Sequence, residues 1–280
     1  MSLRCSKSLN LRSPLVIASG PGGFGEYMNV EGIDWKKVGA YTLKTVTYNP
    51  KEGNPPPRMY AKNGYLINRI GLENPGIDNF INLLENGYFD RLFQEVSVIL
   101  SLGGDTYEEY FEITRKVRPH IGKFVAVEYN FSCPNVRHGG LSIMVDRDEW
   151  KLLLKEIRNM LPNAFLIAKL GIESGFVEEN ALLAYDSGWE GVTLINTIRG
   201  LMFNSEGDMI LGGLSGPNLL PIALRAVYEV RKKLSDIYII ASGGVYNPED
   251  VDLFLKLGAN AVSVGSALFK NEKILDNLIF

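Results

Sequence analysis

The sequence predicts an α/β protein built as a single (β/α)₈ TIM barrel, and two observations support this prediction. Eight short apolar runs recur through the 280 residues, and stretches with helical periodicity lie between most of them. The runs are nearly all apolar rather than alternating, which indicates parallel strands covered on both faces. Eight such units in about 250 residues are typical of a closed barrel, with an open doubly wound sheet as the alternative. The predicted strands are residues 14–20, 40–47, 96–103, 124–133, 164–172, 191–197, 237–245 and 261–268.

Several connecting segments carry local signals of their own. Residues 146–161 place apolar side chains on one helical face. Thr106 opens a capping-box pattern before a second amphipathic run, and Asn247 is the predicted N-cap of the helix between the last two strands. The first dozen residues are expected to form a short hairpin that closes the bottom of the barrel. Residues 48–76 are rich in Pro, Gly and Asn, and so long an excursion in a compact domain tends to be functional.

The composition excludes several functional classes. Hydrophobic residues make up 46% of the chain and charged residues 22%, which suits one globular domain over residues 1–280. A net charge of −3 leaves no basic footprint for nucleic acid. Cys5 and Cys133 are too few for a disulfide framework and lack metal-ligand spacing, so no metal site is expected. With no signal peptide and no apolar run of about 18 residues, the chain is expected to be cytoplasmic and away from membranes.

Polar residues gather where the predicted strands end, which is where barrels of this type place their active sites. Lys44 and Lys169 lie in otherwise apolar strands, and each is costly to bury unless it meets an anion. A bound anionic ligand would explain both lysines. Asn130 and Cys133 end the fourth strand, and a thiol there can act as a general base or nucleophile. The structural alternative is a buried cysteine beside a capping asparagine.

Glycines follow the last two predicted strands, as Gly243-Gly244 and as Gly265 before Ser266. Glycine lets the backbone approach a phosphate closely and offer N–H groups to it, at the place where such barrels commonly hold one. This pattern therefore indicates a phosphate site without indicating which phosphate, and each pair could instead be only a tight turn.

Residues 20–25 match the pattern G-x-G-x-x-G directly after a strand. The match does not indicate dinucleotide binding, because Pro21 and the glycines after it do not open a helix at once. The next strand also ends in Lys44, where a ribose-binding acid would be expected. A flexible loop over the edge of a cofactor is the preferred interpretation.

These residues resemble the dihydroorotate dehydrogenases, which are flavoprotein barrels of pyrimidine synthesis. The resemblance runs from about Leu9 to Phe269 and is closest to the catalytic subunit of the NAD-linked class 1B branch. Chance agreement at this many separated sites is remote. The matching motifs are Asn-x-Ser-Cys-Pro-Asn at 130–135, Asn-Arg-Ile-Gly-Leu-Glu-Asn-Pro-Gly at 68–76, Thr-Leu-Lys-Thr at 42–45, Asn-Thr at 196–197 and Gly-Gly-Leu-Ser-Gly at 212–216.

The resemblance implies one FMN per chain across the barrel mouth, with Lys169 by the flavin N1 edge, where a positive charge stabilises the reduced anion. Cys133 would be the base that takes a proton from C5 of dihydroorotate while C6 gives a hydride to flavin N5, which forms orotate. The implied cofactor-binding residues are Ala18, Ser19, Gly20, Lys44, Thr45, Asn130, Lys169, Ile195, Gly216, Gly243, Gly244, Gly265 and Ser266. The implied substrate-binding residues are Lys44, Asn68, Ile70, Gly71, Leu72, Asn130, Asn135, Asn196 and Thr197.

The loop after the cysteine bears on the electron acceptor. Residues 136–140 resemble the NAD-linked branch, whose flavin barrel pairs with a second subunit that carries FAD and an iron–sulfur cluster. Two cysteines and no credible dinucleotide fingerprint mean that FAD and a 2Fe–2S cluster are expected only on such a partner. The implied assembly is a homodimer core within a heterotetramer. The lack of an N-terminal membrane-associating extension argues against quinone reduction.

Two segments depart from the family pattern, and two other interpretations remain. Residues 170–174 stand where relatives usually carry Ser-Pro-Asn, and residues 141–144 stand where the NAD-linked branch has a Phe-Gly pair. A barrel like dihydropyrimidine dehydrogenase, acting on uracil or thymine, would share the flavin and the cysteine. Substrate choice would then depend on whether Lys44 meets a carboxylate. The remaining alternative is a non-catalytic flavin- or phosphate-binding barrel.

Overall fold

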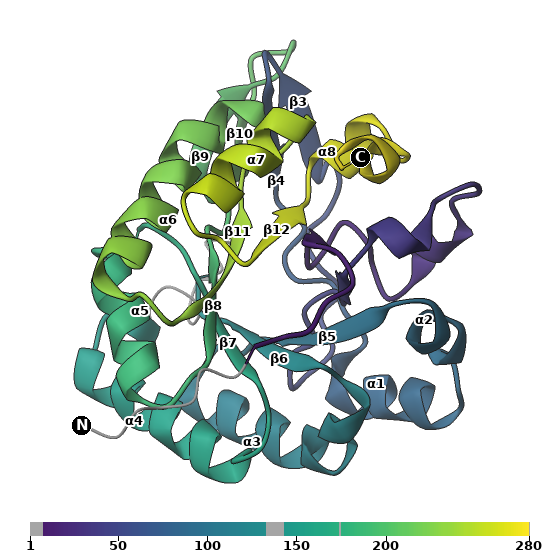
Figure 1. Cartoon of the computed structure of the whole chain (residues 1–280). Helices are drawn as coiled ribbons and strands as arrows, with labels where there is room; N and C mark the ends of the chain where they lie inside the picture. Colours follow the sequence, from purple (N-terminus) through teal and green to yellow (C-terminus); the bar gives the residue numbers. More distant parts are fainter. Residues whose placement is uncertain (1–7, 133–142, 174, 280) are drawn as a thin grey trace.

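The computed structural model describes residues 8–132, 143–173 and 175–279. Within these residues eight parallel strands close a barrel, which confirms the predicted fold class and excludes the open sheet. Each barrel strand lies inside one of the predicted apolar runs, and helices form an arc around them (Figure 1). In order around the barrel the strands are β1 (Leu15–Ile17), β12 (Ala261–Val264), β11 (Tyr238–Ser242), β8 (Gly191–Leu194), β7 (Leu166–Leu170), β6 (Ala126–Asn130), β5 (Ser97–Leu102) and β2 (Ala40–Thr42).

The connecting helices begin at the predicted caps. Asn247 and Asp250 form a reciprocal capping box at the start of the helix that follows β11. Thr106 accepts a hydrogen bond from the backbone N–H of Glu109 at 3.2 Å. The Glu109 carboxylate accepts from the N–H of Asp105 rather than from that of Thr106, so this capping box is half formed. The helices are α1 (Gly76–Glu85), α2 (Asp90–Glu95), α3 (Tyr107–Val117), α4 (Arg147–Met160), α5 (Val177–Asp186), α6 (Leu220–Lys233), α7 (Pro248–Lys256) and α8 (Ala267–Lys270). Short 3-10 segments are η1 (Glu26–Asn29), η2 (Trp35–Lys37), η3 (Arg118–Lys123), η5 (Pro217–Leu219) and η6 (Ile274–Asn277).

The N-terminal segment covers the amino end of the barrel, but its described part does not form the predicted hairpin. Residues 8–13 contain no strand. Instead, the N–H of Leu11 bonds the carbonyl of Leu9 in a tight local turn, which uses backbone groups that a hairpin ladder would need. Leu9 and Leu11 pack against the apolar cluster inside the barrel, so side chains close this end. The other half of the predicted hairpin lies outside the described residues.

The inside of the barrel changes from apolar to polar along the strands. Ala126 and Ile167 belong to an apolar cluster at the amino ends of β6 and β7. Alternate residues of a strand face the same side, so the next inward positions are Glu128 and Lys169, and the one after Glu128 is Asn130. The same step repeats on neighbouring strands. The interior of the barrel is therefore a packed apolar core at the amino ends of the strands and a layer of polar side chains at their carboxyl ends.

The outer faces of the strands pack against the helices. In α4 the apolar face predicted from periodicity is buried, with Trp150 and Leu153 completely enclosed. Trp189 joins this layer and donates a hydrogen bond from Nε1 to the carbonyl of Leu154 at 3.0 Å. Both faces of the barrel strands are thus covered, as the continuous apolar runs predict.

Two insertions pair to form a second sheet, here called the cap sheet, which the sequence did not predict. The hairpin of β3 (Met59–Lys62) and β4 (Tyr65–Asn68) lies in the excursion after β2, and β9 (Ile198–Phe203) and β10 (Met209–Ser215) follow β8. Their order is β3-β4-β10-β9, and Figure 1 shows them together at one end of the molecule. A β carbon at Gly212 would lie 2.2 Å from the carbonyl oxygen of Asn68, so β4 and β10 need glycine at this contact.

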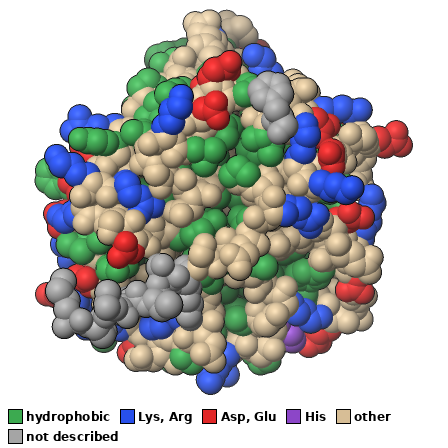
Figure 2. Space-filling model, viewed as in Figure 1, with side chains coloured by type: hydrophobic (Ala, Val, Ile, Leu, Met, Phe, Trp, Pro, Cys, Tyr) green, Lys and Arg blue, Asp and Glu red, His purple; other side chains and the backbone are tan. Residues whose placement is uncertain are grey.

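The surface carries mixed charge. Figure 2 shows basic and acidic side chains interspersed over the visible face rather than gathered by sign. Among the helices of the described ranges, none combines the length and apolar character needed to cross a bilayer. The interspersed charges give the described residues of the visible face no continuous basic patch of the kind that binds nucleic acid.

Candidate functional site

A cavity of about 370 Å³ lies between the carboxyl ends of the barrel strands and the cap sheet. Its size falls in the usual range for small-molecule sites. All but one of the predicted site residues in the described part of the chain line this cavity. They are Ala18, Ser19, Gly20, Lys44, Thr45, Asn68, Ile70, Gly71, Leu72, Asn130, Lys169, Ile195, Asn196, Thr197, Gly243, Gly244, Gly265 and Ser266.

Gly216 is the predicted residue that is not part of the lining. It follows Ser215 with a φ of +118°, and a β carbon there would lie 2.3 Å from the carbonyl oxygen of Gly64. Gly216 therefore allows the end of β10 to pack closely against the turn between β3 and β4. Cys133 and Asn135, the remaining predicted residues, lie outside the described residues.

The sequence missed part of the lining. These residues are Pro21, Met59, Leu66, Glu73, Ser215, Leu219, Ser242, Val245, Ser263 and Phe269. Several are direct neighbours of predicted residues in the chain, and Met59 and Leu66 belong to cap-sheet strands whose existence was not predicted. Gly20 and Pro21, from the loop expected to lie over the edge of a cofactor, both line the cavity.

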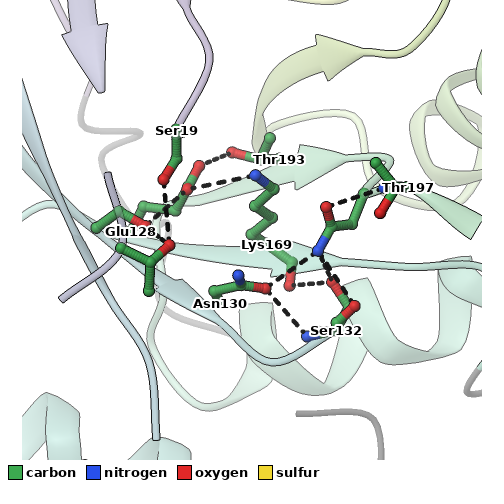
Figure 3. Close-up of polar contacts among 10 residues, drawn as sticks. Ser19, Glu128, Asn130, Ser132, Lys169, Thr193 and Thr197 are labelled. Carbon is green, nitrogen blue, oxygen red and sulfur yellow. Dashed lines mark hydrogen bonds and ion pairs between the residues drawn. The ribbon is translucent and has the colours of Figure 1, made fainter. Parts of the chain in front are cut away.

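Lys169 has a carboxylate partner inside the barrel. Its Nζ lies 3.9 Å from Oε1 of Glu128, which is only 3% exposed (Figure 3). Thr193 donates to Oε2 of Glu128 at 2.7 Å and Ser101 donates to Oε1 at 3.2 Å. Burial of Lys169 alone predicts a ligand anion beside it, but Glu128 supplies a compensating charge from within the protein. Glu128 stands two positions before Asn130 in an otherwise largely apolar strand and was not among the predicted site residues.

Lys44 lies nearer the rim of the cavity. Its Nζ is 3.9 Å from Oε2 of Glu73, and the same oxygen is held at 2.7 Å by Nη1 of Arg58. Burial lowers the pKa of Lys44 from its usual value, and the carboxylate of Glu73 opposes this shift. Because Glu73 is shared with Arg58, its carboxylate does not serve Lys44 alone, and an anionic ligand at the rim can also pair with Lys44.

The side-chain amide of Asn130 has a fixed orientation at the cavity. Oδ1 of Asn130 accepts hydrogen bonds from Nδ2 of Asn196 at 3.2 Å and from the N–H of Ser132 at 3.3 Å. The side-chain oxygen of Asn130 is therefore occupied, and its NH₂ group is the part left to meet a ligand. Oδ1 of Asn196 accepts from the N–H of Thr197 at 2.9 Å, which orders the end of β8 in the same cluster (Figure 3).

One end of the cavity is lined by nearly bare backbone. Gly243 and Gly244 have φ values of +119° and +81°, and a β carbon on Gly244 would lie 2.4 Å from the backbone nitrogen of Leu220. A β carbon on Gly265 would lie 3.5 Å from the β carbon of Ala18, and the neighbouring Ser266 places its Oγ 3.0 Å from the hydroxyl of Tyr246. Side chains are excluded or absent here, which leaves space for a phosphate against the main chain.

The chain that leads to Cys133 is firmly held. Ser132 is 1% exposed, its Oγ donates to the carbonyl of Lys169 at 3.2 Å, and its carbonyl accepts from Nδ2 of Asn196 at 3.1 Å. Tyr110 donates to the carbonyl of Asn130 at 2.7 Å. The last described residues before the cysteine are thus fixed to β7 and to Asn196, which follows β8.

Both departures from the family pattern have a structural role in their described residues. Oε1 of Glu173 accepts the N–H of Arg199 at 2.8 Å and therefore ties the loop after β7 to the start region of β9. Ile143 and Met144 are buried in the main apolar core. Glu173 thus supports the cap sheet, and Ile143 and Met144 support the core. None of these three residues lines the cavity.

The arrangement suits a planar, anionic ligand rich in hydrogen-bond acceptors. Lys44, Lys169 and the NH₂ group of Asn130 are donors that converge on one cavity. Among the described residues, no group of three or more His, Cys, Asp or Glu side chains is placed to hold a metal ion. The chemistry that these side chains can perform is binding and orientation, together with electrostatic stabilisation of added negative charge.

Known proteins resemble this chain along almost its whole length. The sequence profile described as dihydroorotate dehydrogenase matches residues 5–279. The catalytic subunit of dihydroorotate dehydrogenase B (NAD(+)) from Thermotoga maritima is 53% identical over 270 residues, which is 96% of each chain. Dihydroorotate dehydrogenase A (fumarate) from Lactobacillus delbrueckii subsp. bulgaricus is 35% identical, over 94% of this chain and 86% of the relative. The NAD-linked relative is thus the more similar of the two.

A solved structure shares the fold. The crystal structure of DHODH from Eimeria tenella in complex with ferulenol superimposes with a TM-score of 0.79 and 21% sequence identity. The match covers 99% of this chain and 84% of that chain. At this identity the likeness concerns the fold alone, and it agrees with the closed barrel.

Proposed function

Because the chain belongs to the dihydroorotate dehydrogenase family, and is 53% identical to two catalytic subunits of its NAD-linked branch, we propose that it oxidises (S)-dihydroorotate to orotate in pyrimidine synthesis. The whole chain would act as one FMN-binding domain. The observation that carries this proposal is the cavity in which two lysines and an oriented asparagine face a glycine-lined end. An acceptor-rich ring with a carboxylate complements those donors.

The residues present fit FMN. The glycine backbones of Gly243, Gly244 and Gly265 leave room for its phosphate, and Lys169 provides a cation in the adjoining part of the cavity. Ala18, Ser19 and the other predicted cofactor residues that line the cavity would hold the remainder. Bound FMN would supply a two-electron acceptor. The protein contributes the position of the flavin and a charge that favours its reduced form.

The substrate side of the cavity is assigned to the cap sheet and the rim. Lys44 would pair with the substrate carboxylate, and the NH₂ group of Asn130 would donate to a ring oxygen. Asn68, Ile70, Gly71, Leu72, Asn135, Asn196 and Thr197 are the other proposed substrate residues. Dihydrouracil lacks the carboxylate, so pairing with Lys44 would also separate this activity from that of a dihydropyrimidine dehydrogenase.

Cys133 is proposed as the general base. In the oxidation the substrate loses a proton from C5 and a hydride from C6, and the bond between these carbons becomes double. A thiolate takes the proton, and a free cysteine has a pKa of about 8.5. Turnover is therefore expected to rise with pH as Cys133 ionises.

Electrons are proposed to leave through a partner subunit. Two relatives that are 53% identical to this chain are named as catalytic subunits of NAD(+)-linked enzymes, and the two cysteines of this chain cannot ligate a 2Fe–2S cluster, which takes four. FAD and the cluster would be on that partner, around a homodimer of this chain.

An anaerobic titration tests the proposal. The purified chain is expected to be yellow, and dihydroorotate is expected to bleach the flavin absorbance, whereas dihydrouracil leaves it unchanged. Bleaching by dihydrouracil alone would instead support the dihydropyrimidine dehydrogenase activity. NAD(+), fumarate and a quinone, each offered with and without a co-purifying partner, then identify the acceptor.

Substitution of Cys133 tests the base. Cys133→Ala should lose most of the bleaching rate and keep its FMN, because the thiol removes a proton and holds no cofactor. Cys133→Ser should be slower than the wild type at neutral pH, since a hydroxyl ionises far less readily. Cys5→Ala is the matched control and should react at the wild-type rate. Equal rates in Cys133→Ala and the wild type would contradict the assignment.

A further inference from the structure

Glu128 is a buried carboxylate that the proposed reaction does not use directly. It lies in the middle of β6, is 3% exposed, and is absent from the lining of the cavity. Lys169, by contrast, lines the cavity and places its Nζ 3.9 Å from Glu128. A buried carboxylate is costly unless it is paired and hydrogen-bonded. Any influence of Glu128 on a ligand must therefore pass through Lys169 or act through space.

The carboxylate is held on both oxygens. Thr193 donates to Oε2 at 2.7 Å, and Ser101 donates to Oε1, the oxygen that faces Lys169, at 3.2 Å. These partners come from β8 and β5, and β6 lies between β5 and β7. Glu128 thus has little freedom to follow Lys169 if the lysine moves, and it marks a fixed position for the ammonium group (Figure 3).

A chain of hydroxyl groups extends from Glu128 to the cavity. Oγ of Ser101 lies 3.0 Å from Oγ1 of Thr45, which lies 3.1 Å from Oγ of Ser19. A carboxylate only accepts hydrogen bonds, so Ser101 uses its proton on Glu128, Thr45 donates to Ser101, and Ser19 donates to Thr45. The charge of Glu128 therefore orients the hydroxyls as far as the cavity wall.

We propose that Glu128 is a positioning residue for the flavin reaction: its fixed carboxylate holds the Lys169 ammonium and offsets its charge, and so limits how strongly the cavity favours reduced flavin. This inference rests on the proposed binding of FMN. Reduction adds negative charge to the flavin, which a nearby cation stabilises and a nearby anion opposes. Removal of the Glu128 charge should therefore make the bound flavin easier to reduce and should tighten the binding of orotate, an anion.

The reduction equilibrium of bound FMN measures this effect directly. Wild type and Glu128→Gln are reduced anaerobically together with a reference dye of known potential. Glu128→Gln should shift the equilibrium toward reduced flavin by at least about tenfold, which corresponds to about 30 mV for a two-electron couple. Thr193→Val is the matched control, because it removes a hydrogen bond to Glu128 and keeps both charges. Its potential should stay close to that of the wild type.

A double mutant shows whether the effect passes through Lys169. On a Lys169→Met background, Glu128→Gln should change the potential far less than on the wild-type background, because the two substitutions affect one coupled pair. Orotate titrations of the same proteins provide a second readout, with tighter binding expected for Glu128→Gln. A purely structural role for Glu128 would weaken orotate binding instead.

The outcomes separate this inference from the proposed function. A wild-type protein that holds no FMN overturns both. A wild-type protein that is bleached by dihydroorotate, with an unchanged potential in Glu128→Gln, overturns this inference alone. If Glu128→Gln loses its flavin, Glu128→Asp is measured in its place, because it keeps the charge but draws the carboxylate away from Lys169. A smaller shift of the flavin potential in the same direction supports the inference, and an unchanged potential overturns it.

Discussion

Two lysines in one cavity acquire different properties from their surroundings. Lys169 lies deep in the barrel beside the buried Glu128, whereas Lys44 is near the rim and its neighbour Glu73 is 46% exposed. Burial is the largest influence on Lys44 and lowers its pKa from 10.5, while Glu73 only opposes that shift. The charge of Lys44 is therefore lost at a lower pH than that of a fully solvated lysine.

Orotate affinity should fall as pH rises through the pKa of Lys44, with a midpoint below 10.5. The sign follows because the anion binds the protonated lysine, and burial disfavours that form in the free protein. Orotate is titrated across the alkaline range by its effect on flavin absorbance, in a Cys133→Ala background that removes the thiol titration. Lys44→Met in the same background should bind orotate weakly, and its orotate affinity should not fall across this pH range. A midpoint at or above 10.5 would contradict the assignment.

The sequence predicted the site residues at the ends of strands. It did not predict the side chains inside the barrel that pair with them. Asn130 and Lys44 stood out because polar residues interrupt apolar runs where barrel strands finish. Glu128 gave the same signal within its strand, but a single sequence does not show which side chain it faces. Its pairing with Lys169 depends on the registration of β6 against β7, which is a property of the closed barrel.

At the scale of elements, the barrel strands were predictable and the cap sheet was not. Barrel strands are buried on both faces and read as continuous apolar runs. In β9 exposed and half-buried residues alternate, and β10 contains Gly212 and Gly213, which lower strand propensity. The pairing of β4 with β10 joins segments about 145 residues apart, as in the bond from Nδ2 of Asn68 to the carbonyl of Gly213. No local pattern encodes that contact.

Asn74 connects the excursion after β2 to the barrel and should control substrate binding without touching substrate. Its side chain accepts from the N–H groups of Thr47 and Gly76 at 3.1 and 2.9 Å and donates to the carbonyl of Leu72 at 2.6 Å. Asn74→Ala leaves buried polar groups unpaired, each at about 1–3 kcal/mol. We expect a higher KM for dihydroorotate, a lower free energy of unfolding and retained FMN. The exposed Asn79→Ala should leave all three unchanged.

At the scale of the whole molecule, the barrel divides into an apolar amino end and a polar carboxyl end. The apolar end is closed by Leu9 and Leu11 and contributes stability through burial. The polar end leaves a cavity whose lysines and glycines gain partners when a ligand binds. Stability of the whole chain should therefore be linked to occupancy of the cavity.

Removal of FMN should lower the free energy of unfolding, and FMN added at about 100 times its Kd should restore about 2.7 kcal/mol. Urea unfolding of the FMN-free and FMN-loaded protein measures this difference. Riboflavin, which lacks the phosphate, should restore less at the same concentration, because the glycine-lined end of the cavity then stays without its anion. Equal stabilisation by riboflavin would show that these glycines do not hold phosphate.

The cap sheet has a consequence for how substrate range can change in descendants of this chain or in the laboratory. Its two hairpins are inserted at separate points of the barrel, yet β4 and β10 form one hydrogen-bonded ladder. Exchange of a single hairpin with that of a relative would break the ladder, so a transplant must carry both. The barrel beneath would keep its layered interior, and new specificity could be grafted onto an unaltered redox scaffold.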